Sequence, residues 1–135
     1  MKFDFEVATL GSLAVEAKLP LVANLVEALT SVNIAFLKSH ETVRLYESEV
    51  RYELMPWTWL DIPAILTRKR ADCKSLVAWR LAELRVEESE DARIHFVVQK
   101  AREHTVFHVQ IQRANGRIED PSRRLGMRAR ERNSW

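Results

Sequence analysis

The sequence predicts one domain that mixes helices with antiparallel strands, which is the α+β class. Its length of 135 residues suits a single domain that buries its own core. Apolar residues recur at three- and four-residue steps over residues 20–36 and 73–84, which is typical of helices. Residues 94–112 are strand-like and are followed by Asn115-Gly116, the strongest short hairpin signal.

The N-terminal half is expected to contain two strands and a long helix. Alternating polarity predicts half-buried strands over residues 2–8 and 49–54. Between them, Pro20 favours a helix that starts there, because proline suits a first turn. The apolar stripe of this helix is Leu21, Val22, Leu25, Leu29, Val32 and Phe36.

Two shorter helices follow, and the second carries the only cysteine. Asp61 can cap a helix that ends at the basic run 68–70, and Asp72 offers the next N-cap. Cys73 then lies in the first turn of a helix whose apolar stripe continues to Leu84.

The C-terminal half is expected to be a sheet of strands 94–99 and 105–112, with residues 117–120 returning antiparallel after the Asn115-Gly116 turn. On the middle strand, His104, His108 and Gln110 share one face, while Phe107 lies on the other.

Composition limits the class of protein. Apolar residues make up 47% and charged residues 30%, as in soluble globular proteins. One cysteine excludes an internal disulfide and a multi-cysteine zinc site, which indicates a reducing, cytoplasmic compartment. The stretch 19–37 contains Pro20, Asn24, Glu27 and Asn33 and is expected to be too polar to span a membrane.

Cys73, His108 and Asp120 occur in the order that a thiol nucleophile needs. A helix N-terminus and an imidazolium both favour the thiolate, so we expect the pKa of Cys73 to be lowered. His108 can protonate a leaving amine, and Asp120 on the return strand can orient the imidazole. Each residue alone is also explained without catalysis: a packed thiol, a hydrogen-bonded histidine and a turn aspartate before Pro121.

The motifs around these residues resemble the transglutaminase-like superfamily. Residues 71–76, Ala-Asp-Cys-Lys-Ser-Leu, resemble its Gly-Asp-Cys-Lys-Asp nucleophile motif. Residues 108–111, His-Val-Gln-Ile, resemble its His-Ala-Trp strand, and 120–122, Asp-Pro-Ser, resemble its Asp-Pro-Thr. The likeness covers about residues 59–126, and His108 lies 35 residues after Cys73 and 12 before Asp120.

The resemblance implies a papain-like fold in which a helical part carrying the nucleophile packs on an antiparallel sheet. It also implies a cysteine-dependent amide hydrolase or acyl transferase, with a peptidase as the first expectation, that forms a thioester and needs no cofactor. Ala71 in place of glycine and Gln110 in place of tryptophan depart from the pattern. Candidates for the oxyanion hole or the cleft wall are Tyr52, Trp57, Trp59 and Gln110.

Two other readings stay open. Seven arginines between residues 113 and 132 form a basic C-terminal end, and an inactive transglutaminase-like module could bind a protein or nucleic acid through Arg123, Arg124 and Arg128. Cys73, His104, His108 and Asp120 could instead form a zinc site, although no His-Glu-x-x-His motif is present. For the catalytic reading we expect a protein or peptide substrate, and neither a membrane nor a nucleic acid as partner.

Overall fold

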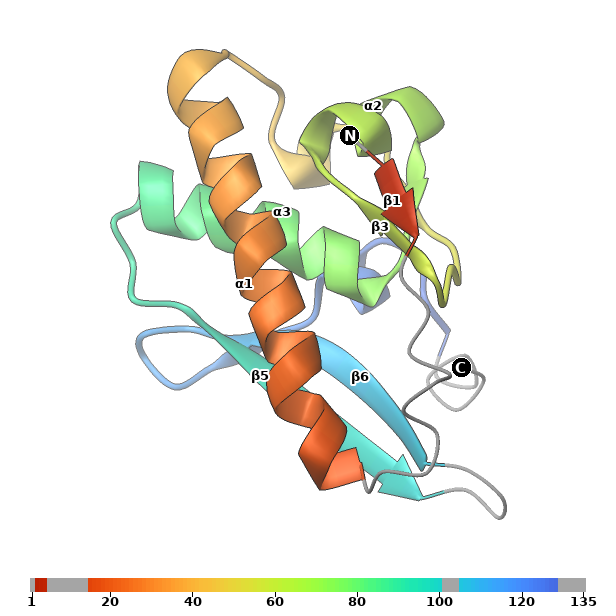
Figure 1. Cartoon of the computed structure of the whole chain (residues 1–135). Coiled ribbons are helices and arrows are strands. Elements are labelled where there is room, and N and C mark those ends of the chain that lie inside the picture. Colours follow the sequence, from red (N-terminus) through yellow and green to blue (C-terminus); the bar gives the residue numbers. More distant parts are fainter. Residues whose placement is uncertain (1, 5–14, 101–104, 129–135) are drawn as a thin grey trace.

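Two helices that cross each other, together with a small sheet, form the centre of the molecule (Figure 1). The computed structural model describes residues 2–4, 15–100 and 105–128. Helix α1 (Val15–Ser39) packs across α3 (Cys73–Glu87). Both helices share a core with a three-stranded sheet of β5 (Arg93–Lys100), β6 (Thr105–Gln112) and β7 (Ile118–Glu119). The protein is thus a mixed helix-and-strand structure compatible with the α+β class.

The sheet agrees with the strands predicted from the sequence. Its order is β5-β6-β7, and both neighbouring pairs are antiparallel. The register places Val97 opposite His108, and Ile111 opposite Glu119. Gly116 has a φ of +87°, in the left-handed region that glycine adopts without strain, so the turn forms where Asn115-Gly116 predicted it.

Small elements surround the start of α3. Strand β1 (Lys2–Asp4) pairs antiparallel with β3 (Thr58–Leu60), and β2 (Arg51–Tyr52) pairs parallel with β4 (Arg70–Ala71). The short helices are η2 (Leu45–Glu47), α2 (Ile62–Arg68) and α4 (Pro121–Arg124). The strand predicted over 2–8 is confirmed as far as Asp4, and residues 5–8 lie outside the described residues. The strand predicted over 49–54 is shorter, with only two paired residues.

Helix α1 differs from its prediction at its start and on one face. It begins at Val15, so Pro20 lies inside the helix rather than in its first turn. The missing N–H of Pro20 removes one helical hydrogen bond, a loss that packing of the 25-residue helix offsets. Val32, expected in the stripe, is 39% exposed. Asn33, the next residue, is buried instead. Its Oδ1 accepts the Ile62 N–H at 3.0 Å, which provides a hydrogen-bond partner for the first backbone N–H of α2.

Helix α3 is buried on all sides, not only along its predicted stripe. Every residue from Cys73 to Leu84 is buried. One core cluster joins α3 to α1 and the sheet, and a second joins it to η2, α2 and the segment after α4. Asp61 caps α2 as predicted, with its Oδ1 accepting the Ala64 N–H at 3.2 Å. Asp72 occupies the N-cap position of α3, and its carboxylate pairs with Lys74 and also interacts with the Ser75 N–H.

Helix α1 is also the one described segment that is long and apolar enough to cross a membrane. The segment Lys18–Ser39 has a mean hydropathy of 1.5, and core helices of soluble proteins meet the same criterion. In this structure Val22, Val26 and Leu29 are buried in the core cluster that contains α3. The expectation that this stretch does not span a membrane stays a prediction.

Candidate active site

Three separate elements bring Cys73, His108 and Asp120 into one region. Cys73 is the first residue of α3, His108 lies on the central strand β6, and Asp120 follows β7 as the N-cap of α4. The order of strands puts the return strand β7 beside β6, so Asp120 reaches the strand that carries His108.

His108 and Asp120 form a direct, nearly buried pair. The distance from His108 Nε2 to Asp120 Oδ2 is 2.9 Å, and the two side chains are 3% and 12% exposed. An ionised carboxylate can only accept hydrogen bonds, so Nε2 carries the proton of this contact. In a neutral imidazole Nδ1 then holds the lone pair. Nδ1 is buried and has no hydrogen-bond partner.

The Asp120 carboxylate is held from two further directions. Gln110 Nε2 donates to the same Oδ2 at 3.0 Å. The Arg123 N–H donates to Oδ1 at 3.3 Å and caps the four-residue helix α4, whose first residue is Pro121. The orientation of His108 therefore depends on a carboxylate that the chain fixes at both oxygens.

Cys73 is a buried thiol that forms no hydrogen bond with Nδ1 of His108. Its side chain is 1% exposed, and the backbone N–H of Val109, the residue after His108, interacts with it. Burial is the main cause that raises the pKa of Cys73 to about 12; the Asp72 charge adds to this, while Lys74 and the Val109 N–H oppose it. The expected lowering of the thiol pKa is therefore wrong for this closed arrangement. Desolvation outweighs the favourable field of the helix start, and the thiol is protonated at neutral pH.

A buried ion pair flanks the cysteine. Lys74 Nζ pairs with the Asp72 carboxylate and donates to the Met55 carbonyl at 2.7 Å. The same ammonium lies 5.3 Å from the centroid of the Trp59 ring, within the range of a cation–π interaction. Lys74 therefore ties the loop before β3 to the first turn of α3. The sequence reasoning did not single out this contact, although Lys74 belongs to the motif that contains Cys73.

The predicted cleft residues lie in different environments. Trp59 is buried beside Lys74, and Trp57 is 47% exposed in the preceding turn. Tyr52 is half-buried on β2, and its backbone N–H donates to the Leu125 carbonyl at 2.9 Å. Gln110 donates to Asp120 Oδ2, the same oxygen that His108 contacts. The role of any of them as an oxyanion donor stays a prediction.

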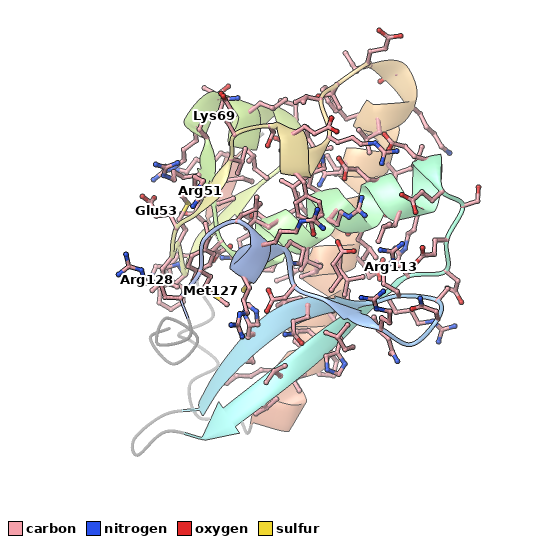
Figure 2. The ribbon with its side chains drawn as sticks, turned by 180° about the vertical axis from the view of Figure 1, so that it is seen from behind. Arg51, Glu53, Lys69, Arg113, Met127 and Arg128 are labelled. Carbon is pink, nitrogen blue, oxygen red and sulfur yellow. The ribbon has the colours of Figure 1, made fainter. Side chains whose placement is uncertain are left out.

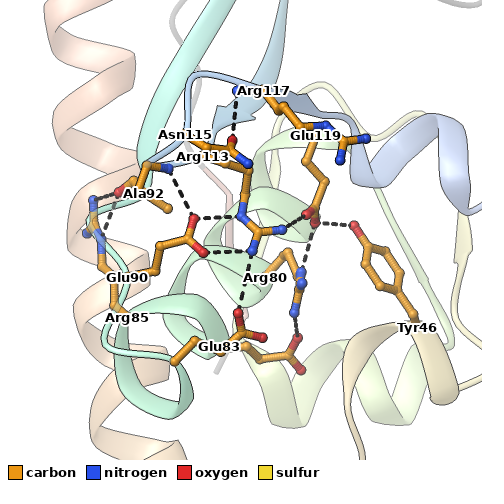
Figure 3. Close-up of polar contacts among 12 residues, drawn as sticks. Tyr46, Arg80, Glu83, Arg85, Glu90, Ala92, Arg113, Asn115, Arg117 and Glu119 are labelled. Carbon is orange, nitrogen blue, oxygen red and sulfur yellow. Dashed lines mark hydrogen bonds and ion pairs between the residues drawn. The ribbon is translucent and has the colours of Figure 1, made fainter.

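A network of ion pairs, which sequence reasoning missed, attaches the hairpin that carries Asp120 to α3 (Figure 3). Glu119 Oε2 accepts from Arg80 Nε at 2.8 Å and from the Tyr46 hydroxyl at 2.6 Å. Glu119 Oε1 accepts from Arg113 at 2.7 Å, and Arg113 also bonds Glu90. The only local signal was the spacing of Arg80 and Glu83 on one helix face, because the other partners are far apart in the sequence.

Two alternatives to the catalytic hypothesis are a zinc site and a binding surface at the basic C-terminal end. Within the described part of the chain, no group of three or more histidine, cysteine or acidic side chains could hold a metal ion, and His104 of the zinc reading lies outside it. Of the basic end, Arg113 is in ion pairs, Arg124 stacks on the Tyr46 ring at 3.9 Å, and residues 129–135 lie outside the described residues.

Comparisons with protein-family models, with curated proteins and with solved structures found no match to this chain.

Proposed function

We propose that the protein is a cysteine-dependent amide hydrolase or acyl transferase of papain-like fold, with peptides as the first substrates to test. The observation that carries the proposal is the hydrogen bond from His108 Nε2 to Asp120, which leaves a buried Nδ1 without a partner. The Cys73 thiol interacts with the backbone of the very next residue, Val109. A base that a carboxylate orients, on a strand that also contacts a lone thiol, can support nucleophilic catalysis once the thiol reaches Nδ1.

Each residue then has one chemical task. His108 Nδ1 accepts the Cys73 proton, and the thiolate sulfur attacks the carbonyl carbon of an amide. The resulting imidazolium protonates the leaving amine as the C–N bond breaks, which leaves a thioester on Cys73. Water or an amine, deprotonated by His108, attacks the thioester and restores the thiol. Asp120 holds the imidazole and stabilises its charged form.

The described conformation requires one further step. Because Cys73 and His108 are 1% and 2% exposed, a substrate reaches them only after neighbouring elements open. Opening also admits water, removes the burial that raises the thiol pKa, and exposes the thiol beside the same imidazole. The proposal therefore places activation of the thiol in an open conformation that keeps the β6–β7 hairpin intact.

Alkylation of the single cysteine tests the proposal. We expect iodoacetamide to label the native protein at pH 7 faster than the His108→Gln variant, by about tenfold or more, because the glutamine keeps a donor toward Asp120 but provides no base. Mass spectrometry counts the label, Cys73→Ala reports the background, and circular dichroism shows whether each variant is folded.

Equal rates of alkylation in the native protein and in a folded His108→Gln variant would contradict the proposal. A labelling rate that rises with urea in parallel with global unfolding would also contradict the proposal, since the thiol would then react only in the unfolded chain.

Burial of the thiol favours a second candidate, an inactive transglutaminase-like module that binds a protein or nucleic acid through its basic end. Arg123, Arg124 and Arg128 are exposed in the structure. This module would bind RNA or an acidic peptide equally well after Cys73→Ala, and binding would weaken with salt and with loss of these arginines. Binding that does not depend on salt would exclude it.

A further inference from the structure

A pocket at the β6–β7 hairpin is lined by more arginines than acids. It has a volume of about 340 Å³ and is lined by Arg113, Asn115, Arg117, Ile118, Glu119 and Arg124. This volume is within the range of small-molecule sites. The lining holds three arginines and one glutamate.

The glutamate of the pocket is already fully engaged. Glu119 accepts hydrogen bonds from Arg80 and Tyr46 at Oε2 and from Arg113 at Oε1. Arg113 in turn binds Glu90 through two nitrogens, each at 2.6 Å. Glu119 and Arg113 are thus held by these partners, and neither forms an ion pair with Arg117 or Arg124 within the described residues.

The guanidinium groups of Arg117 and Arg124 therefore have no acidic partner within the described residues. Within the described residues, neither forms a hydrogen bond or ion pair through its guanidinium, and both side chains are exposed. Arg124 Cζ lies 3.9 Å from the centroid of the Tyr46 ring. Stacking on an aromatic face restrains the guanidinium while its N–H groups, which lie in the guanidinium plane, stay available to an anion.

The third donor comes from the hairpin turn. Asn115 Oδ1 accepts the Arg117 N–H at 3.0 Å, which fixes the side chain and leaves its NH₂ group as a donor. Two guanidinium groups that form no ion pair within the described residues, together with an amide donor, match an oxyanion with two negative charges better than a singly charged carboxylate.

From these contacts we propose that the pocket binds a phosphate dianion, either as free phosphate or as the terminal phosphate of an ester. The inference does not depend on the catalytic proposal, because the pocket lining includes neither Cys73 nor His108. The volume leaves room for part of an ester beside the phosphate group.

The test is an NMR titration of the ¹⁵N-labelled full chain with inorganic phosphate, phenyl phosphate and acetate at constant ionic strength. We expect saturable shifts at the amides of residues 115–119 and 124 with the phosphates and not with acetate. A lower Kd for phenyl phosphate would assign the site to an ester, and a lower Kd for inorganic phosphate would assign it to the free ion.

Matched variants locate the site. Arg117→Gln and Arg124→Gln should each raise the Kd for phosphate about tenfold, the effect of losing a charge-assisted hydrogen bond. Arg124→Lys should recover only part of the affinity, because lysine keeps the charge but not the planar fork. Arg128→Gln removes the same charge on the far side of the molecule from Arg113 and should leave the Kd unchanged (Figure 2).

The proposal is overturned by acetate shifts equal to those of phosphate, or by phosphate shifts that do not saturate. It is also overturned if Arg128→Gln weakens binding as much as Arg124→Gln, since that result would indicate a diffuse basic surface rather than a pocket.

Discussion

At the scale of single residues, Asp120 serves two purposes with one side chain. Its Oδ2 accepts from His108 and Gln110, while its Oδ1 caps α4 through the Arg123 N–H. A change at Asp120 would therefore disturb both the imidazole and the local backbone. His108→Gln is the cleaner probe of catalysis for this reason, because it leaves the cap of α4 in place.

A pH-dependent contribution is expected from Glu90. Hydrogen bonds from Arg113 favour its ionised form and lower its pKa from an ordinary value of 4.5 to about 2. Since the folded pKa is the lower one, its contribution to stability is present above pH 4.5 and is lost as the pH falls toward 2. Glu90→Gln should lower the free energy of unfolding by about 1 kcal/mol at pH 7 and by progressively less as the pH falls below 4.5.

Urea unfolding of the native protein and of Glu90→Gln at pH 7, 5 and 3 measures the difference in the free energy of unfolding. Glu88→Gln is the control, because Glu88 is more exposed and its contact with Arg113 is longer, at 3.4 Å. A destabilisation by Glu90→Gln that stays constant from pH 7 to pH 3 would contradict the assigned cause.

At the scale of elements, the first turn of α3 depends on a charged pair that lies in the interior. The side chains of Lys74 and Asp72 are 3% and 1% exposed, and burial raises the pKa of Asp72 although Lys74 opposes that shift. Removing water from both charges is costly, so the pair stabilises this turn only while both partners are present.

Lys74→Met should therefore lower the free energy of unfolding by about 3 kcal/mol, because it removes the counter-ion of the buried Asp72 carboxylate. The double variant Asp72→Asn/Lys74→Met should recover most of that loss, since it removes the buried charge as well. Urea denaturation of the two variants beside the native chain measures both changes. Equal instability of the single and double variants would show that the Lys74 contacts with Met55 and Trp59, rather than the ion pair, hold the turn.

At the scale of the whole molecule, α3 is the element around which the others are arranged. Helix α1 and the sheet cover one side of it, and the short elements around residues 45–71 and 121–127 cover the other. Burial on all sides explains why the hydrophobic periodicity of residues 73–84 predicted the helix but not its surroundings. Arg80 and Glu83 are inside the protein, where Arg80 forms ion pairs with both Glu83 and Glu119.

Packing of α1 on this core is tested by two substitutions on the same helix. Leu29 is 2% exposed, so Leu29→Ala should lower the free energy of unfolding by about 2–5 kcal/mol through lost burial and a cavity. Val32, at 39% exposed, should tolerate Val32→Ala within about 0.5 kcal/mol. Thermal or urea unfolding of both variants provides the comparison. A larger effect at Val32 than at Leu29 would mean that the outer face of α1, not the inner one, is the buried face.

Local physics accounts for the parts that sequence patterns predicted. The N-cap Asp61, the turn at Asn115-Gly116 and the start of α3 at Cys73 depend on neighbouring residues, so they can be inferred from a short stretch of chain. The start of α1 could not, because packing against the rest of the protein overrides the preference of Pro20 for a first turn.

The sequence by itself determined the three main helices, the strands of the three-stranded sheet and the order of the three residues that could form a catalytic site, but not η2, β3, β4 or α4. Only the tertiary structure decided that His108 bonds Asp120, that Cys73 is buried with a raised pKa, and that Glu119 joins Arg80 to Arg113. The physical reason is distance along the chain: hydrogen bonds and desolvation depend on side chains that fold together from separate elements, and local periodicity does not encode which of them meet.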